Sequence, residues 1–220
     1  MRKITGVPRI LGWTAALLSI LTMLAGSAWT LQTVYGAALG EVAVVGKYNA
    51  LTMVLDNGTS KASELLASIN ASSSVTVKKV LRYDVGSGFI TYDPDDPFSS
   101  DFSIQVGDPL FVLVEGSSSS AYSLVGDVPD AGSVEFNLVG SASSCRFNYI
   151  SIPLDQSDLD GGHASDLATA MGNVAKVLTY EPAFGFITYQ VDDPFSSDFS
   201  VQIGYPYFVC MTNTTPFVWP

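Results

Sequence analysis

The chain has 220 residues, of which 47% are hydrophobic and 14% are charged, so it carries enough apolar material to form a core and does not have the composition of a disordered protein. All 21 acidic residues but only seven of the ten basic ones follow residue 28, which leaves a net charge of −14 on that part of the chain. This excess argues against nucleic-acid binding. It suits a salty or calcium-containing exterior, or simply keeps the protein soluble.

Residues 1–28 are typical of a signal peptide, because Arg2, Lys3 and Arg9 precede a long apolar run that ends in small residues. Ala28 is the predicted cleavage site and Ala38 is a second candidate. An uncleaved run of this length would instead anchor the chain in a membrane. In both cases the rest of the chain is expected at the cell surface or outside the cell, with residues 29–40 as an N-terminal arm.

The sequence of residues 88–112 returns at residues 185–209 with 19 identities in 25 positions. Within this stretch, residues 95–103 recur without change at residues 192–200. Self-similarity of this length indicates an internal duplication. We therefore expect two repeats, residues 41–131 and residues 132–220.

Each repeat is predicted to hold a series of strands and one short helix, which makes the fold class mainly β (α+β), with two duplicated modules that resemble a β-sandwich or barrel. The helix of the first repeat is expected to begin after a cap at Thr59 or Ser60. Glycines at 88 and 185 are placed to open a hairpin in each repeat. The predicted strands cover residues 41–46, 47–55, 75–85, 89–92, 102–106, 110–114 and 122–125, then 134–140, 146–154, 175–181, 186–189, 199–203, 207–211 and 217–219; the predicted helices cover residues 60–69 and 163–171.

The two cysteines, Cys145 and Cys210, both lie in the second repeat. An exported protein can keep such a pair oxidised, so one disulfide is expected. A structural zinc site needs four ligands, and the chain has a single histidine, His163. We expect His163 to be a surface residue at the start of a helix.

The repeated acidic loop is the best candidate for a site. Clustered oxygen ligands suit calcium, which accepts six to eight of them. In the alternative interpretation the aspartates form turns and cap the next strand, while Phe98 and Phe195 fill the core. The candidate calcium ligands are Asp95, Asp96, Asp101, Asp192, Asp193 and Asp198.

Three Asn-x-Ser/Thr sequences, at Asn57, Asn70 and Asn213, permit N-glycosylation in a host that performs it. The aromatic residues lie mostly in strand patterns, which predicts that they fill the interior and weakens the case for a sugar-stacking surface.

The second repeat resembles a module found in many bacterial and archaeal secreted and cell-surface proteins, whose pattern runs from Trp-Asn-Leu-Ile-Ser-Leu-Pro-Leu to a closing Gly-x-Gly-Tyr-Trp-Val. Residues 147–154 (FNYISIPL) are similar to the first motif, residues 186–189 (FITY) to a middle strand, and residues 204–209 (GYPYFV) to the last. The resemblance implies a secreted, non-catalytic role.

Taken together, these features predict a structural or interaction protein of a cell-surface layer, adhesin or fibre, and not an enzyme. Self-association or other surface proteins are the expected partners, and the arm is predicted to insert as a strand into the next subunit. The alternative is a calcium-dependent ligand-binding module, with glycans as candidate ligands.

Overall fold

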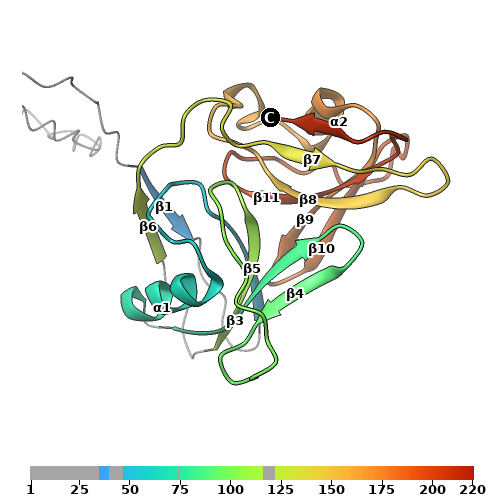
Figure 1. The fold of residues 1–220 in the computed structure, drawn as a ribbon. Coiled ribbons are helices and arrows are strands. Elements are labelled where there is room, and N and C mark those ends of the chain that lie inside the picture. The colour runs from blue at the N-terminus through green and yellow to red at the C-terminus, as the bar shows by residue number, and fades with distance from the viewer. Residues whose placement is uncertain (1–34, 40–46, 74, 116–121) are drawn as a thin grey trace, which may run out of the picture. The chain divides into compact units, whose positions relative to one another are not determined.

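The computed structural model describes residues 35–39, 47–73, 75–115 and 122–220, and all of them belong to one unit, Gln32–Pro220. The predicted leader and the predicted strand at residues 41–46 lie outside the described residues. In chain order the elements are β1 (Tyr35–Leu39), β2 (Lys47–Thr52), α1 (Ala62–Ser72), β3 (Thr76–Asp84), β4 (Gly88–Tyr92), β5 (Pro109–Glu115), β6 (Tyr122–Gly126), β7 (Phe136–Leu138), β8 (Arg146–Ser151), the short 3-10 helix η1 (Ser157–Leu159), α2 (Ala164–Met171), β9 (Val174–Glu181), β10 (Gly185–Gln190), β11 (Pro206–Met211) and β12 (Phe217–Trp219) (Figure 1).

The described fold is mainly β, as predicted, with antiparallel sheets and two α-helices. The N-terminal half (β1 to β6) contains a four-stranded sheet in the order β2-β5-β3-β4. The C-terminal half (β7 to β12) contains a second four-stranded sheet in the order β8-β11-β9-β10. Two small sheets complete the topology, β1 with β6 and β7 with β12.

The hairpins form where the sequence places glycine. Gly88 and Gly185 open β4 and β10 with φ of 79° and 82°. Backbone in this left-handed region is disfavoured for other residues, so glycine allows the chain to turn back directly after β3 and β9. The return strands then pair antiparallel with the strands before them.

Each half buries one face of its helix. Leu65 and Ile69 of α1 are fully buried, and Leu167 of α2 is buried in the same way. The predicted cap of α1 is wrong, because the residue before the helix is Lys61 rather than Thr59 or Ser60. The first turn of the helix is held by a carboxylate from a distant loop, described below.

The predicted strands at residues 102–106 and 199–203 are not strands. Their side chains alternate, with Phe102 and Ile104 buried and Ser103 exposed. However, their backbone pairs with the residues just before the helix, through single bridges from Lys61 to Ser103 and from His163 to Ser200. The alternation of apolar and polar residues therefore predicted correctly which side chains are buried, but the predicted strand pairing was wrong.

Each half has its own core, and a third cluster lies between the two four-stranded sheets. The third cluster contains Leu81, Phe111, Tyr149 and Phe208, all buried. Tyr149 belongs to the C-terminal half and stacks on Phe111 of the N-terminal half with ring centroids 5.1 Å apart. Leu81 of β3 is buried in this cluster because the second sheet packs against the face of β3 that carries it.

Candidate assembly edge and acidic loops

The N-terminal strand β1 lies beside β6 (Figure 1). Five residue pairs join the two strands, from Tyr35 opposite Gly126 to Leu39 opposite Tyr122. β6 is fixed to the body of the protein because Tyr122 and Leu124 are buried in the N-terminal core, and the Tyr122 hydroxyl lies 3.1 Å from Ser68 Oγ of α1. β6 is therefore an anchored strand whose ladder partner comes from the segment that the sequence assigned to an arm.

The C-terminal half closes the corresponding place from within. There β12 pairs with β7, and Trp219 opposite Phe136 brings their rings to 6.2 Å. Trp219 and Leu138 are buried in the C-terminal core. The two halves thus differ in where the partner of their last strand comes from. β7, the partner of β12, lies inside the second predicted repeat, whereas β1, the partner of β6, precedes the first.

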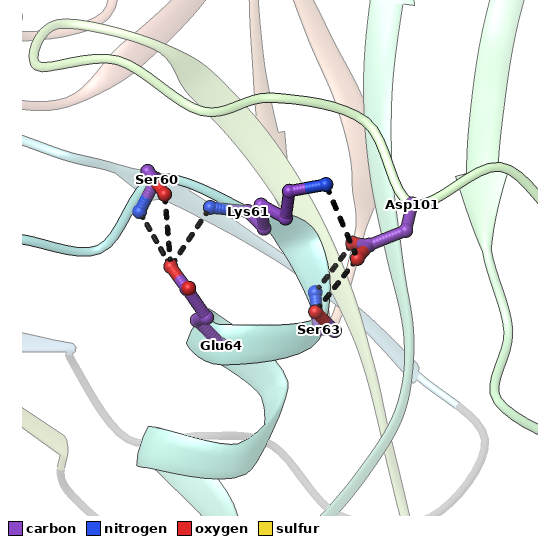
Figure 2. Close-up of polar contacts among 5 residues, drawn as sticks. All are labelled: Ser60, Lys61, Ser63, Glu64 and Asp101. Atoms are coloured by element: carbon purple, nitrogen blue, oxygen red, sulfur yellow. Dashed lines mark hydrogen bonds and ion pairs between the residues drawn. The ribbon is translucent and has the colours of Figure 1, made fainter.

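The acidic loop of the N-terminal half, residues 93–101, reaches the start of α1 (Figure 2). The backbone N–H and the hydroxyl of Ser63 donate hydrogen bonds of 2.9 and 2.8 Å to the two carboxylate oxygens of Asp101. Lys61 Nζ lies 4.0 Å from the same carboxylate, and both side chains are partly exposed, so this ion pair contributes little. Asp101 therefore satisfies a free N–H group of the first helical turn and places negative charge at the positive end of the helix.

Glu64 completes the same helix start from inside the helix (Figure 2). Its carboxylate accepts hydrogen bonds from the backbone N–H groups of Ser60 and Lys61, at 2.8 and 3.2 Å. The bond from the Ser60 backbone is the main reason that the pKa of Glu64 lies below its ordinary value. These contacts turn the chain from the preceding loop into the helix.

The C-terminal half repeats this arrangement. Ser165 donates from its backbone N–H and its hydroxyl to Asp198, at 2.9 and 2.7 Å. The carboxylate of Asp166 accepts the backbone N–H of His163 at 2.8 Å. His163 is exposed and directly precedes α2, as expected for a surface residue at a helix start.

The tips of both acidic loops expose a phenylalanine. The backbone N–H of Phe98 donates to Asp96 at 2.9 Å, and that of Phe195 donates to Asp193 at 3.0 Å, so each aspartate closes a short turn. Phe98 is 94% exposed and Phe195 is 95% exposed. The prediction that these two rings fill the core is wrong, because the turn directs them away from it.

The aspartates proposed as calcium ligands do not all lie in one place: some contact a helix start, some close a turn, and some line a hollow. Asp95 is exposed at the tip of the first loop. Asp192, Asp193 and Asp198 line an open hollow of about 360 Å³ together with Tyr189. Within the described ranges, no three His, Cys, Asp or Glu side chains are placed so that they could hold one metal ion. Calcium binding stays a prediction.

An ion pair ties the first acidic loop to the sheet. Lys79 Nζ lies 2.9 Å from Asp93 Oδ2. The hydrogen bond from Lys79 lowers the pKa of Asp93, and the same bond raises the pKa of Lys79. In the C-terminal half, Lys176 occupies the position of Lys79 and Gln190 that of Asp93, 97 residues later, so the loop there lacks this charge pair.

The predicted disulfide between Cys145 and Cys210 is confirmed, with the two Cα atoms 5.2 Å apart. It joins the residue before β8 to the buried end of β11, next to the ladder that pairs these strands. The bond therefore reinforces the C-terminal sheet alone.

The three sequons lie in different surroundings. Asn57 lies in a turn, where its side-chain oxygen accepts the N–H of Thr59. Both atoms of the Asn70 amide form hydrogen bonds: Oδ1 accepts the backbone N–H of Val77 at 2.6 Å, and Nδ2 donates to the Val77 carbonyl at 3.1 Å. Asn213 is half-buried in the segment between β11 and β12.

The layer between the sheets opens to the surface in two apolar pockets that were not foreseen. Phe89 and Phe186 are 49% and 50% exposed and line both of them. The first pocket, of about 220 Å³, is lined by Tyr48, Leu81, Phe89, Phe111, Tyr180 and Phe186. The second, of about 190 Å³, is lined by Tyr83, Phe89, Phe147, Leu178, Phe186 and Phe208.

The linings of the two pockets correspond position by position. Leu81, Phe89 and Phe111 of the first pocket return 97 residues later as Leu178, Phe186 and Phe208 of the second. The aromatic residues were predicted to fill the interior, and the side-chain pattern of a single strand does not show where a layer between two sheets opens to the surface.

Comparison with models of protein families, with curated proteins and with solved structures finds no match to this chain. Among the residues that the structure describes, neither helix is long and apolar enough to cross a membrane.

Proposed function

We propose that this chain is an exported, non-catalytic structural protein that assembles into an extracellular layer or fibre by giving its β1 strand to the β6 edge of the next copy. The observation that carries the proposal is the pairing of β1 with β6. A five-residue strand from the N-terminal segment occupies an edge whose other strand is fixed in the core.

Strand exchange costs little free energy because the same backbone hydrogen bonds form whether β1 belongs to the same chain or to a neighbour. A two-stranded sheet is also only marginally stable by itself, so β1 is an element that can leave. Donor and acceptor are different surfaces of the chain, so head-to-tail exchange gives an open fibre wherever the rotation between copies does not close a dimer or ring.

Processing of the leader decides whether the donor strand exists. Cleavage after Ala28 leaves all of β1 on the mature protein, whereas cleavage after Ala38 removes every β1 residue except Leu39. The proposal therefore requires cleavage at the first site. The disulfide favours an oxidising location outside the cytoplasm.

We also infer that the two halves arose by duplication of one secreted module of the kind that the second predicted repeat resembles. Support comes from the corresponding strand orders of the two large sheets and from the matched contacts of Asp101 with Ser63 and of Asp198 with Ser165.

A pair of cysteines tests the exchange directly. Gly36 and Val125 are opposite each other in the β1–β6 register, and Val125 is exposed. Directly opposed residues are close enough for a disulfide after small adjustment. In the G36C/V125C protein, oxidation of an assembled sample should give a ladder of covalent oligomers on a non-reducing gel.

The two single variants, G36C and V125C, are the matched controls and should give no ladder beyond a dimer. If the double variant yields only internally bridged monomers while assemblies are visible by electron microscopy, β1 stays in its own chain and the proposal is wrong.

A second candidate function is calcium-dependent binding of a ligand such as a glycan. The observation in its favour is the hollow that Asp192, Asp193 and Asp198 line beside the ring of Tyr189. Calorimetric titration of the mature chain with calcium tests it, since binding requires a heat signal that D193N/D198N abolishes.

A further inference from the structure

Two identical side chains project from two matching loops, and both are almost entirely in water. Phe98 and Phe195 are 94% and 95% exposed. The turn below each ring is reinforced, because Ser99 donates to the Asp93 carbonyl at 2.6 Å and Ser196 donates to the Gln190 carbonyl at 3.0 Å. A phenylalanine ring that stays in water contributes no hydrophobic free energy of burial until another surface covers it.

The same chain carries two apolar pockets whose linings correspond to each other. Their volumes are about 220 and 190 Å³. A cavity of about 150 Å³ with apolar walls is enough to hold one benzene ring. Each pocket therefore has room for one phenylalanine ring, and its aromatic walls offer the edge-to-face contacts that aromatic pairs prefer.

The exposed fractions of Phe98 and Phe195 show that neither ring occupies a pocket of its own chain. The described residues thus offer two exposed loop rings and two aromatic pockets. Both sets follow the same spacing of 97 residues, from Phe98 to Phe195 and from Phe89 to Phe186.

Near the second pocket, a lysine without an ion-pair partner in the described part of the chain makes this pocket the better match for an acidic loop of another copy. Lys176 lies two residues before Leu178 on β9, so both side chains point to the same face of the sheet. No ion pair with Lys176 occurs among the described residues, whereas its counterpart Lys79 is neutralised by Asp93. An incoming loop with acidic residues on the N-terminal side of its phenylalanine complements this lysine.

We propose that the rings of Phe98 and Phe195 insert into the aromatic pockets beside Phe89 and Phe186 of a second copy of this chain. This contact rests on the proposed function as a self-assembling protein and adds a side-chain contact to the strand exchange. Ring and pocket are different surfaces, so the contact can propagate from copy to copy.

The test uses the complete mature chain carrying G36C/V125C, oxidised within each monomer so that β1 cannot be exchanged. Its self-association is measured by sedimentation, with and without F98A/F195A. Loss of two aromatic anchors should weaken association at least about 30-fold. The matched control is F184A, because Phe184 is also a largely exposed phenylalanine, at 81%, and lies outside the acidic loops.

A photoreactive phenylalanine analogue at position 195 identifies the receiving surface. In a mixture of isotopically light and heavy chains, it should form crosslinks between chains to residues that line the second pocket. Crosslinks to other surfaces, equal association of F98A/F195A and its parent, or the lack of any association in the locked chain would each overturn the contact. Covalent ladders from the unlocked G36C/V125C protein would still support strand exchange, so the two proposals fail separately.

Discussion

Replacement of Asp101 by alanine is expected to destabilise the protein through the start of α1. The substitution removes two hydrogen bonds from Ser63 to a charged acceptor. Loss of an N-cap side chain typically costs about 0.5–2 kcal/mol. Hydrogen bonds to charged groups are each worth about 1.5–3 kcal/mol when buried, and partial exposure of Asp101 places this case at the lower end. We expect the free energy of unfolding to fall by about 2 kcal/mol.

The assay is urea denaturation followed by circular dichroism, carried out once with calcium and once with a chelator. A structural carboxylate gives the same loss in both solutions, because Ser63 needs no metal to donate its hydrogen bonds. D95A is the matched control, since Asp95 lies in the same loop, is exposed and carries the same charge. It should change the free energy of unfolding by less than about 0.5 kcal/mol.

Two results would refute this reasoning. If D101A is as stable as the parent in both solutions, the contacts with Ser63 do not hold the helix start. If the destabilisation occurs only with calcium and disappears with the chelator, Asp101 acts as a metal ligand, and the calcium-dependent alternative gains support. D198A should behave as D101A does, because Ser165 makes the same pair of hydrogen bonds with Asp198.

Three further outcomes follow from the described contacts. Removal of the disulfide in C145A/C210A should lower the free energy of unfolding by about 4 kcal/mol, given a separation of 65 residues, and a change in Trp219 fluorescence at lower urea would report it. Burial raises the pKa of Tyr207 to about 12, whereas a tyrosine in the unfolded chain has a pKa of about 10. The contribution of the buried neutral hydroxyl to stability is therefore complete below about pH 10 and is lost as the pH rises towards 12. In denaturation curves, the free energy of unfolding of Y207F should decline less steeply than that of the parent between these pH values. N70A leaves the N–H and carbonyl of Val77 without their side-chain partner and should lower the melting temperature by several degrees, whereas an unchanged value would mean that these bonds are replaced by water.

Local features of the fold could be predicted because each depends on neighbouring residues. The hairpins at Gly88 and Gly185 follow from backbone freedom at glycine, and the buried face of α1 follows from the spacing of Leu65 and Ile69. The disulfide was predicted from the presence of two cysteines after a segment typical of a signal peptide, although the two residues are 65 positions apart. The predictions of the hairpins and of the helix face require no knowledge of what lies across the protein.

Two predictions about what surrounds a segment were wrong. The period-two pattern of residues 102–106 correctly indicated that Phe102 and Ile104 are buried, but a pattern of side chains carries no information about which backbone lies alongside. Hydrophobicity placed Phe98 in the core, whereas the turn closed by Asp96 exposes it. An apolar residue in a loop has the same sequence signature whether it is covered by its own chain or by another.

The difference between the halves restricts how copies can join. In the C-terminal half, β7 fills the place beside β12, and the Cys145–Cys210 bond holds the neighbouring sheet. In the N-terminal half, the corresponding place beside β6 is filled by β1, and the sequence has no cysteine before Cys145. Under the proposed strand exchange, one donor strand and one acceptor edge per chain limit each copy to two neighbours through this contact. Under the proposed insertion of Phe98 and Phe195, the acidic loops and aromatic pockets, which occur in both halves, add further contacts between the same copies.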